Sequence, residues 1–313
     1  MNHRSVDSQD SQDSQERSQA KNGEICTTGP IAELESNDHP PRSMTSETTV
    51  SPNSYTLRGK PRYFPNGQMV TVQKVYNELK KKSRISINPT RPTSNTGMKL
   101  PGMPIARDKV NEFGGRDQIF VIDDCNPLRD YRENIAMTAR VIGYTVKVTD
   151  TNGMDIFFSS ASCSPQKCQS SSDVEKTIIG RHPVTGWCDM ENCLRNVMKR
   201  VDHDGMKPTS IYIFTDGIWN PTKNNDGVKK IIDDAITSLI EKGKEPRHLM
   251  FQFVQFGHDE NGYKRLDDLD KNCKRRYNGV VYDIVDRKYW DEDVPTIVVG
   301  SIDPSNDDDD ESE

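Results

Sequence analysis

Apolar positions in the second half of the chain fall into two alternating patterns. Short apolar runs of strand length occur at 118–122, 154–158, 211–214, 249–256 and 280–284. Between them, apolar residues recur every three or four positions, as on one face of a helix, over 131–144, 190–201, 228–240 and 263–273. This order predicts an α/β domain with a doubly wound, mostly parallel sheet and helices on both faces.

Acidic residues follow two of the predicted strands. Asp123 and Asp124 come directly after the run 118–122, and Asp216 comes shortly after the run 211–214. The carboxyl ends of parallel strands share one edge of the sheet, where open α/β sheets bind ligands. Carboxylates gathered there need a cation or hydrogen-bond donors to compensate them. This edge is therefore the candidate functional site.

Composition separates the first 110 residues from the rest. Residues 7–15 repeat Asp-Ser-Gln three times, and the mean hydropathy of the chain is -0.82. The net charge is -5 over residues 1–50, +10 over 51–110 and -11 over the remainder. Segments of low apolar content cannot offset their ordering entropy. We expect four segments: a disordered acidic Ser/Gln-rich tail over 1–55, a basic segment with a short helix and a proline-rich linker over 56–110, the folded domain over 111–303, and an acidic disordered tail over 304–313.

The basic segment contains one amphipathic pattern. Val72, Val75, Tyr76 and Leu79 have the spacing of one helical face, and Lys-Lys-Lys-Ser-Arg follows at 80–84. Such a helix can bind a membrane surface, a nucleic-acid backbone or an acidic partner, or it can dock on the domain of its own chain. The net charge of -11 over residues 111–313 disfavours nucleic acid as the partner.

The sequence also indicates a compartment. No stretch approaches the roughly 20 apolar residues of a membrane span, and the first residues lack the apolar run of a signal peptide. Seven cysteines without CxxC pairs indicate reduced thiols. We expect an intracellular, cytoplasmic protein, with the nucleus left open by the basic cluster at 80–84. Cys163 and Cys168, in a Ser-rich loop over 159–172, are expected to be exposed.

Three motifs occur in order along the predicted domain: Ile-Phe-Val-Ile-Asp-Asp-Cys-Asn-Pro at 119–127, Gly-Trp-Cys-Asp-Met-Glu at 186–191 and Thr-Asp-Gly at 215–217. Together they resemble the metal-site segments of von Willebrand factor A (VWFA) domains. The later segments 251–257, 266–270 and 281–286 resemble those of intracellular fungal members, so that the resemblance covers about residues 112–303. It implies the same doubly wound fold and a role in binding proteins.

The five side chains of the family's metal site map to Asp123, Cys125, Pro127, Cys188 and Asp216. Only the two aspartates are retained, since both serines and the threonine are replaced. Mg²⁺ requires oxygen ligands, whereas proline offers no donor and cysteine offers sulfur. The resemblance therefore implies a degenerate Mg²⁺ site.

The same mapping leaves three interpretations of the cysteines. Cys125, Cys188 and the two aspartates Asp123 and Asp216 could hold Zn²⁺ tetrahedrally, or the two thiols could form a disulfide. The interpretation we favour is that two small cysteines fill the space left by serine and threonine.

Two classes of function follow. We favour a non-enzymatic protein-binding module with an unidentified protein partner, in which the binding surface includes Trp187, Trp219 and the loop 159–172. The alternative for either tryptophan is a place in the core. The alternative is an enzyme, either a zinc-dependent hydrolase on the Asp/Cys rim or a phosphohydrolase using Asp123. Against the phosphohydrolase, we expect the adjacent Asp123 and Asp124 to point to opposite faces. No phosphate-binding or metalloprotease motif and no nucleophile–base pair supports an enzyme.

Overall fold

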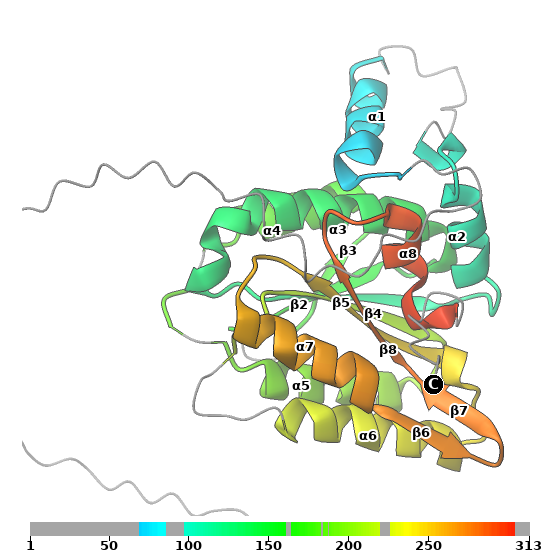
Figure 1. Ribbon diagram of the computed structural model, residues 1–313. Helices are drawn as coiled ribbons and strands as arrows, with labels where there is room; N and C mark the ends of the chain where they lie inside the picture. Colours follow the sequence, from blue (N-terminus) through cyan, green and yellow to red (C-terminus); the bar gives the residue numbers. More distant parts are fainter. Residues whose placement is uncertain are drawn as a thin grey trace, which may run out of the picture. The chain divides into compact units, whose positions relative to one another are not determined.

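A six-stranded sheet forms the centre of the computed structural model, which describes residues 69–85, 97–160, 164–182, 184–186, 188–219 and 226–303 (Figure 1). The strand order is β3-β2-β1-β4-β5-β8, and only β3 runs antiparallel to its neighbour. The strands are β1 (Asp117–Ile122), β2 (Met154–Phe158), β3 (Gln166–Cys168), β4 (Thr209–Thr215), β5 (Leu249–Gln255) and β8 (Val285–Tyr289). The predicted α/β class with a mostly parallel sheet is confirmed. The predicted tails over 1–55 and 304–313 lie outside the described residues.

The register of the central strands determines what meets at the carboxyl edge. Ile122 at the end of β1 is paired with Phe158 of β2 on one side and with Phe214 of β4 on the other. Every residue of β4 and β5 is buried, as expected for parallel strands covered on both faces. The residues that follow these strand ends, including Asp123, Ser159 and Asp216, therefore emerge close together.

Helices cover both faces of the sheet, because alternate strand residues point to opposite sides. Phe120 and Ile122 belong to one apolar cluster, and Ile119 and Val121 belong to the other. The first cluster includes residues of α1 (Val72–Ile85), α2 (Met103–Val110), α3 (Arg132–Val146), α4 (Ser171–Gly180) and α8 (Val294–Val299). The second includes residues of α5 (Met190–His203), α6 (Asp226–Glu241) and α7 (Glu260–Asn272) (Figure 1).

Short 3-10 helices connect these elements: η2 (Gly97–Lys99), η3 (Asn126–Tyr131), η4 (Lys147–Thr149), η5 (Pro246–His248) and η6 (Gly300–Ile302). Among the described residues, no helix combines the length and the apolar character that crossing a bilayer requires.

The last predicted strand is misplaced. Residues 280–284 were expected to complete the sheet, but β7 (Val280–Asp283) pairs with β6 (Lys274–Tyr277) in a separate antiparallel hairpin. Asn278 and Gly279 at its turn both have positive φ, which suits the Asn-Gly turns of hairpins. The sheet ends instead on β8, whose sequence VDRKY is too charged to be recognised as a buried strand.

The sequence pattern also missed four packed elements: β3, α2, α4 and α8. Pro104 and Pro295 lie in the first turns of α2 and α8, where proline is well tolerated, so the proline-rich stretch expected to be a linker contains a buried helix. Cys168, expected to be exposed, lies on β3 and is only 3% exposed, so this prediction is wrong. Cys163 lies outside the described residues.

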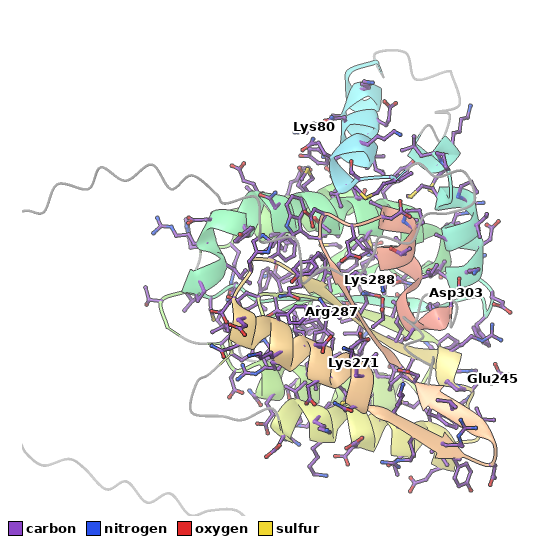
Figure 2. All side chains as sticks on the ribbon, in the orientation of Figure 1. Lys80, Glu245, Lys271, Arg287, Lys288 and Asp303 are labelled. Carbon is purple, nitrogen blue, oxygen red and sulfur yellow. The ribbon has the colours of Figure 1, made fainter. Side chains whose placement is uncertain are left out.

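Helix α1 docks on the domain of its own chain, one of the alternatives left open by its pattern. Val72, Val75 and Leu79 are buried in the same cluster as α3. The outer side of the helix is basic, and the Lys80 ammonium lies 4.4 Å from the centroid of the Tyr76 ring (Figure 2). The Val70 amide donates to Asp293 Oδ1 at 2.6 Å, so the packed structure begins about 40 residues before the expected domain start.

Candidate functional site at the carboxyl edge of the sheet

Asp123 lies immediately after β1 and is almost completely enclosed. Its side chain is 3% exposed, and Thr215 Oγ1 donates to its Oδ2 at 2.9 Å. The Cys125 amide and the Ser159 hydroxyl each lie 3.4 Å from Oδ1. Burial raises the pKa of Asp123 to about 6, although the hydrogen bonds from Cys188, Thr215 and Cys125 favour the charged form. The carboxylate is therefore held by donors of the protein itself.

Thr215, the last residue of β4, makes three hydrogen bonds through one hydroxyl. It donates to Asp123 and accepts from the Gly217 amide at 3.0 Å and from Trp219 Nε1 at 2.9 Å. Trp219 is 6% exposed and belongs to an apolar cluster, so of the two alternatives, surface anchor or core residue, the structure supports the core. Trp187, the other expected anchor, lies outside the described residues. Gly217 has φ +80°, and a Cβ there would meet the Gly262 carbonyl at 2.6 Å, so this turn requires glycine.

The two cysteines of the predicted site do come together with Asp123. The ligand atoms of Asp123, Cys125 and Cys188 all lie within 4.8 Å of one another, and all three residues are buried. Both thiols are free. The pKa of Cys188 is well above its usual range because its thiol hydrogen-bonds with Cys125, and because burial and the charge of Asp123 disfavour a thiolate. We call Asp123, Cys125, Cys188 and Thr215 the acid–thiol cluster.

Asp216, the fourth predicted site residue, lies beside this cluster. Its Oδ1 accepts from the Ile218 amide at 2.7 Å, and its side chain is 8% exposed. Burial, followed by the charge of Asp123, raises its pKa to about 7. Among the described residues, the ligand atoms that lie within 4.8 Å of one another belong to Asp123, Cys125 and Cys188, and the carboxylate of Asp216 is not one of them. Pro127, the fifth position implied by the resemblance, lies in the first turn of η3.

The chemistry of the donors does not fit Mg²⁺. Of the five implied positions, only Asp123 and Asp216 offer oxygen, and each already accepts hydrogen bonds from the protein. The spacing of Asp123, Cys125 and Cys188 suits a Zn²⁺ ion better, because thiolates bind zinc at about 2.3 Å. Zinc would have to displace the proton of a Cys188 thiol whose pKa is raised. Zinc binding stays a prediction.

A second carboxylate, Asp124, faces the outer side of the same edge. It accepts from the Ser160 amide at 3.0 Å, from the Ser160 hydroxyl at 2.6 Å and from Arg181 Nε at 3.0 Å. The Ser159 hydroxyl lies 3.3 Å from Asp124 Oδ1 and 3.4 Å from Asp123 Oδ1. The two adjacent carboxylates were expected to point to opposite faces, but both reach Ser159, because β1 has already ended at Ile122.

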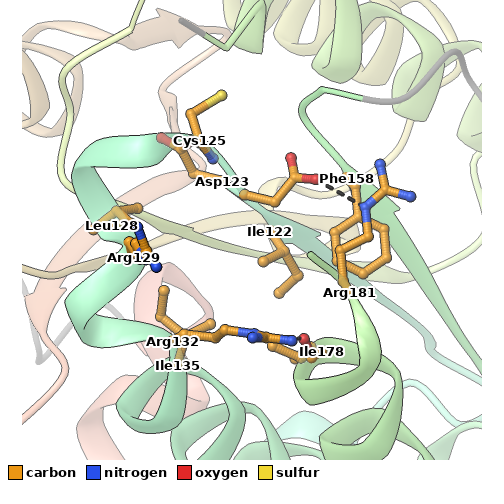
Figure 3. A pocket seen from close by; sticks show the side chains of 11 residues that line it. Ile122, Asp123, Cys125, Leu128, Arg129, Arg132, Ile135, Phe158, Ile178 and Arg181 are labelled. Carbon is orange, nitrogen blue, oxygen red and sulfur yellow. Dashed lines mark hydrogen bonds and ion pairs between the residues drawn. The ribbon is translucent and has the colours of Figure 1, made fainter. Parts of the chain in front are cut away.

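An open pocket lies directly beside the acid–thiol cluster, between η3, α3 and the end of α4. It has about 320 Å³ of space not filled by atoms, counted out to the solvent. Its lining consists of Ile122, Asp123, Asp124, Cys125, Leu128, Arg129, Arg132, Ile135, Phe158, Ile178 and Arg181 (Figure 3). Five of these residues are apolar and three are arginines. We call this the arginine pocket.

Sequence reasoning missed Thr215, Ser159, Ser160 and the three arginines as site residues. Ser159 carried a usable signal, because it follows the strand β2 at the same edge as Asp123. The arginines carried none, since they belong to no motif and come from three different segments.

Comparison with known proteins gives a distant structural likeness only. No family model matches the chain, and no curated protein matches it. A von Willebrand factor type A protein from Catenulispora acidiphila is 14% identical over 59% of this chain and 40% of its own length, with a TM-score of 0.37. The SpRpn10 VWA domain is 9% identical over 59% of this chain and 93% of its own length, with a TM-score of 0.38. The chain spans less than half of the length of the first protein.

Proposed function

We propose that this chain is a non-enzymatic protein-binding module that contacts its partner through the carboxyl edge of the sheet without Mg²⁺. One observation carries the proposal. The reactive groups at this edge are buried and hydrogen-bonded to one another, whereas the surface beside them opens into a pocket with apolar and arginine walls. Arginine side chains are enriched at recognition surfaces, and three of them line this pocket.

The acid–thiol cluster is poorly suited to catalysis. A nucleophilic Asp123 would have to reach a substrate, but it is 3% exposed and accepts a hydrogen bond from Thr215. The thiolate, not the thiol, is the nucleophilic form of cysteine, and Cys188 is both fully buried and raised in pKa. A zinc hydrolase on this rim would need a coordination position open to solvent.

An exposed apolar residue extends the recognition surface. Val184 is 39% exposed and forms a backbone bridge with Cys125, so it lies at the carboxyl edge next to the cluster. Apolar side chains ringed by polar residues are characteristic of interfaces. Val184 therefore provides a substitution of an exposed side chain in a residue whose backbone bridges to Cys125 of the cluster.

The test is capture of a partner by the full-length protein from an extract of the cells that make it. Wild type, Val184→Asp and the control Ile105→Asp are compared in Mg²⁺ and in EDTA, because Ile105 is an equally apolar, 51% exposed residue on α2. We expect a stoichiometric partner to be retained by wild type and by the control in both buffers. Val184→Asp should lose it.

Three results would overturn the proposal. They are a partner retained only in Mg²⁺, the absence of any partner sensitive to Val184→Asp, and turnover of ester or phosphate-monoester substrates. Turnover that disappears in Asp123→Asn would instead support the hydrolase alternative.

A further inference from the structure

We propose that the acid–thiol cluster binds a soft monovalent cation, copper(I), between the sulfur atoms of Cys125 and Cys188. Such a site would be additional to the proposed protein-binding surface, because it lies in the buried cluster rather than on the surface beside it. Four features of the cluster support it: the kind of donor atom, the number and spacing of the donors, the exclusion of water, and the charge of the surroundings.

Two of the three donor atoms that converge in the cluster are sulfur. The thiols of Cys125 and Cys188 are both free, and they hydrogen-bond with each other. Thiolate sulfur is a soft ligand, which selects copper(I), zinc and iron–sulfur clusters over Mg²⁺ and Ca²⁺. The third donor, the Asp123 carboxylate, already accepts a hydrogen bond from Thr215 at 2.9 Å. The donor set therefore favours an ion that can bind through the two sulfurs alone.

The number and spacing of the donors separate copper(I) from the other soft metals. In the part of the chain that the structure describes, the histidine, cysteine and acidic side chains that converge supply three ligand atoms. A structural Zn²⁺ takes four ligands and an iron–sulfur cluster takes four cysteines, whereas copper(I) is commonly bound by two or three sulfurs. The three atoms lie within 4.8 Å of one another. An ion in line between two sulfurs holds them about 4.6 Å apart, if each metal–sulfur bond is about 2.3 Å long.

Burial keeps out the water that would complete the ligand shell of another ion. Cys188 is completely buried, Cys125 is 4% exposed and Asp123 is 3% exposed. A catalytic Zn²⁺ keeps one position open to water, and Mg²⁺ usually keeps several waters. Copper(I) needs no water ligand. Because Asp123 and Cys125 also line the arginine pocket, that pocket provides an entry route from solvent to the sulfur atoms.

Binding exchanges protons for the ion, and a nearby arginine favours the product. Two thiols and one copper(I) ion give a bis-thiolate complex with one negative charge and two released protons, and the copper stays in the +1 state. The guanidinium charge of Arg265 attracts negative charge on Cys188 and on Asp216. Its Nη1 donates to the Gly217 carbonyl at 2.9 Å, and the guanidinium lies 5.4 Å from the centroid of the Trp219 ring. Arg265 is therefore held where it compensates the charge of the complex.

The experiment titrates the full-length protein with copper(I) under anaerobic conditions, in competition with the chromogenic copper(I) chelator bathocuproine disulfonate. The background protein carries Cys26→Ser and Cys163→Ser, which remove two thiols outside the described residues. We expect it to hold one equivalent of copper(I). Cys125→Ser and Cys188→Ser should each lower the affinity by more than about a hundredfold, since even groups outside the ligand shell contribute about 10- to 100-fold. Cys273→Ser, at a buried cysteine outside the cluster, should leave the affinity unchanged.

Two further measurements identify the ligands of the ion. Asp123→Asn should lower the affinity for copper(I) by no more than about tenfold, the lower end of the effect of a group outside the ligand shell, because the sulfurs hold the ion. X-ray absorption at the copper edge of the loaded background protein should show sulfur as the only neighbour of copper. Urea unfolding of each variant without metal shows whether it folds.

Failure to hold copper(I) against the chelator, an equal loss in Cys273→Ser, or binding that survives Cys125→Ser/Cys188→Ser would overturn the inference. Zinc bound in preference to copper(I) and lost in Asp123→Asn would also overturn it, in favour of a zinc site. If a cysteine variant fails to fold, the absorption spectrum decides, and oxygen or nitrogen neighbours of copper overturn the inference. None of these results affects capture of a partner through Val184, so the proposed function is tested separately.

Discussion

The acid–thiol cluster and the arginine pocket are neighbours that share Asp123 and Cys125, yet they have opposite properties. In the cluster, hydrogen bonds join the polar groups to one another. The Thr215 hydroxyl alone bonds with Asp123, Gly217 and Trp219. In the pocket, two of three guanidinium charges have no carboxylate partner among the described residues. The comparison teaches that closeness to a strand end does not decide whether a polar group is available, since the fold pairs some of these groups and leaves others without a charged partner.

The largest expected effect comes from opening the cluster with Thr215→Val. The substitution removes the donor to Asp123 and the acceptor of Gly217 and Trp219, all at buried positions. Since each unsatisfied buried polar group costs about 1–3 kcal/mol, we expect the free energy of unfolding in urea to fall by about 2–5 kcal/mol. Thr237→Val on α6, a partly buried control, should cost no more than about 1 kcal/mol. Equal losses would mean that Thr215 does not hold the cluster closed.

A second prediction converts the cluster into an ion site. The variant Cys125→Ser/Pro127→Ser/Cys188→Thr restores three hydroxyls at the positions implied by the family resemblance. We expect its Tm to rise with Mg²⁺, with a stabilisation of about 2.7 kcal/mol at a hundred times the Kd, whereas the Tm of wild type should not respond. Cys273→Ser, at a buried cysteine outside the cluster, controls for the loss of a buried thiol. A Mg²⁺-dependent Tm in wild type would contradict the donor argument.

Metal analysis of the wild-type protein tests whether the acid–thiol cluster binds zinc. Protein purified without chelator should contain much less than one zinc per chain by mass spectrometry, because only three ligand atoms converge in the described residues and Asp123 already accepts a hydrogen bond from Thr215. Stoichiometric zinc that is lost in Cys125→Ser/Cys188→Ser would contradict this expectation. It would also make the cluster a metal site and favour the hydrolase alternative.

Asp270 on α7 is a half-buried acid outside the acid–thiol cluster, so it tests the effect of burial on a carboxyl group by itself. Burial and then the charge of Asp286 raise the pKa of Asp270 on α7 to about 8, while Lys288 and Arg287 act in the opposite direction and Asp283 adds to the increase (Figure 2). The folded state thus keeps a proton that the unfolded state releases near pH 4, so this contribution to stability is lost as pH rises toward 8. Asp270→Asn should flatten the decline in urea midpoint between pH 5 and 8, and Asp234→Asn, an exposed carboxylate on α6, should not. An unchanged slope in Asp270→Asn would refute the assignment.

The smallest expected effect belongs to the pocket. Arg129→Ala should change the free energy of unfolding by less than about 0.5 kcal/mol, because Arg129 is exposed and has no ion-pair partner among the described residues. Arg132→Ala should cost about 1 kcal/mol, because it removes the donor to the Ile179 carbonyl, while the Ile178 carbonyl keeps the Arg181 amide. Urea unfolding of both variants checks the order. A larger loss for Arg129→Ala would mean that this charge stabilises the fold rather than remaining available for a ligand.

The central fold could be predicted because β1, β4 and β5 are buried on both faces and are therefore continuous apolar runs. The edge strand β8 could not, because its charged residues pair with α7 side chains that only the fold brings near it. Helix α4 begins in a Ser-rich stretch that resembles a loop, although Ser170 caps it by accepting from the Asp173 amide.

The candidate site, like the fold, could be predicted from the sequence only in part. Asp123, Cys125 and Cys188 could be expected to converge because the family resemblance maps all three to one site, and the structure brings them together. The role of Thr215 depends on the direction of its hydroxyl, which no sequence pattern indicates. Arg132 and Arg181 meet only because α3 packs against α4, so the pocket is a product of tertiary structure.

The hydrogen bonds between Val70 and residues 293–294 have a practical consequence for the production of the protein. Val70 bonds to both Asp293 and Val294, and α1 and α2 cover apolar surface of α3 and α8. A fragment begun at residue 111, where the motifs begin, would contain every recognisable motif but would expose that surface to solvent. Such a fragment should aggregate on expression, and its insolubility would reflect the choice of boundary rather than an unstable protein.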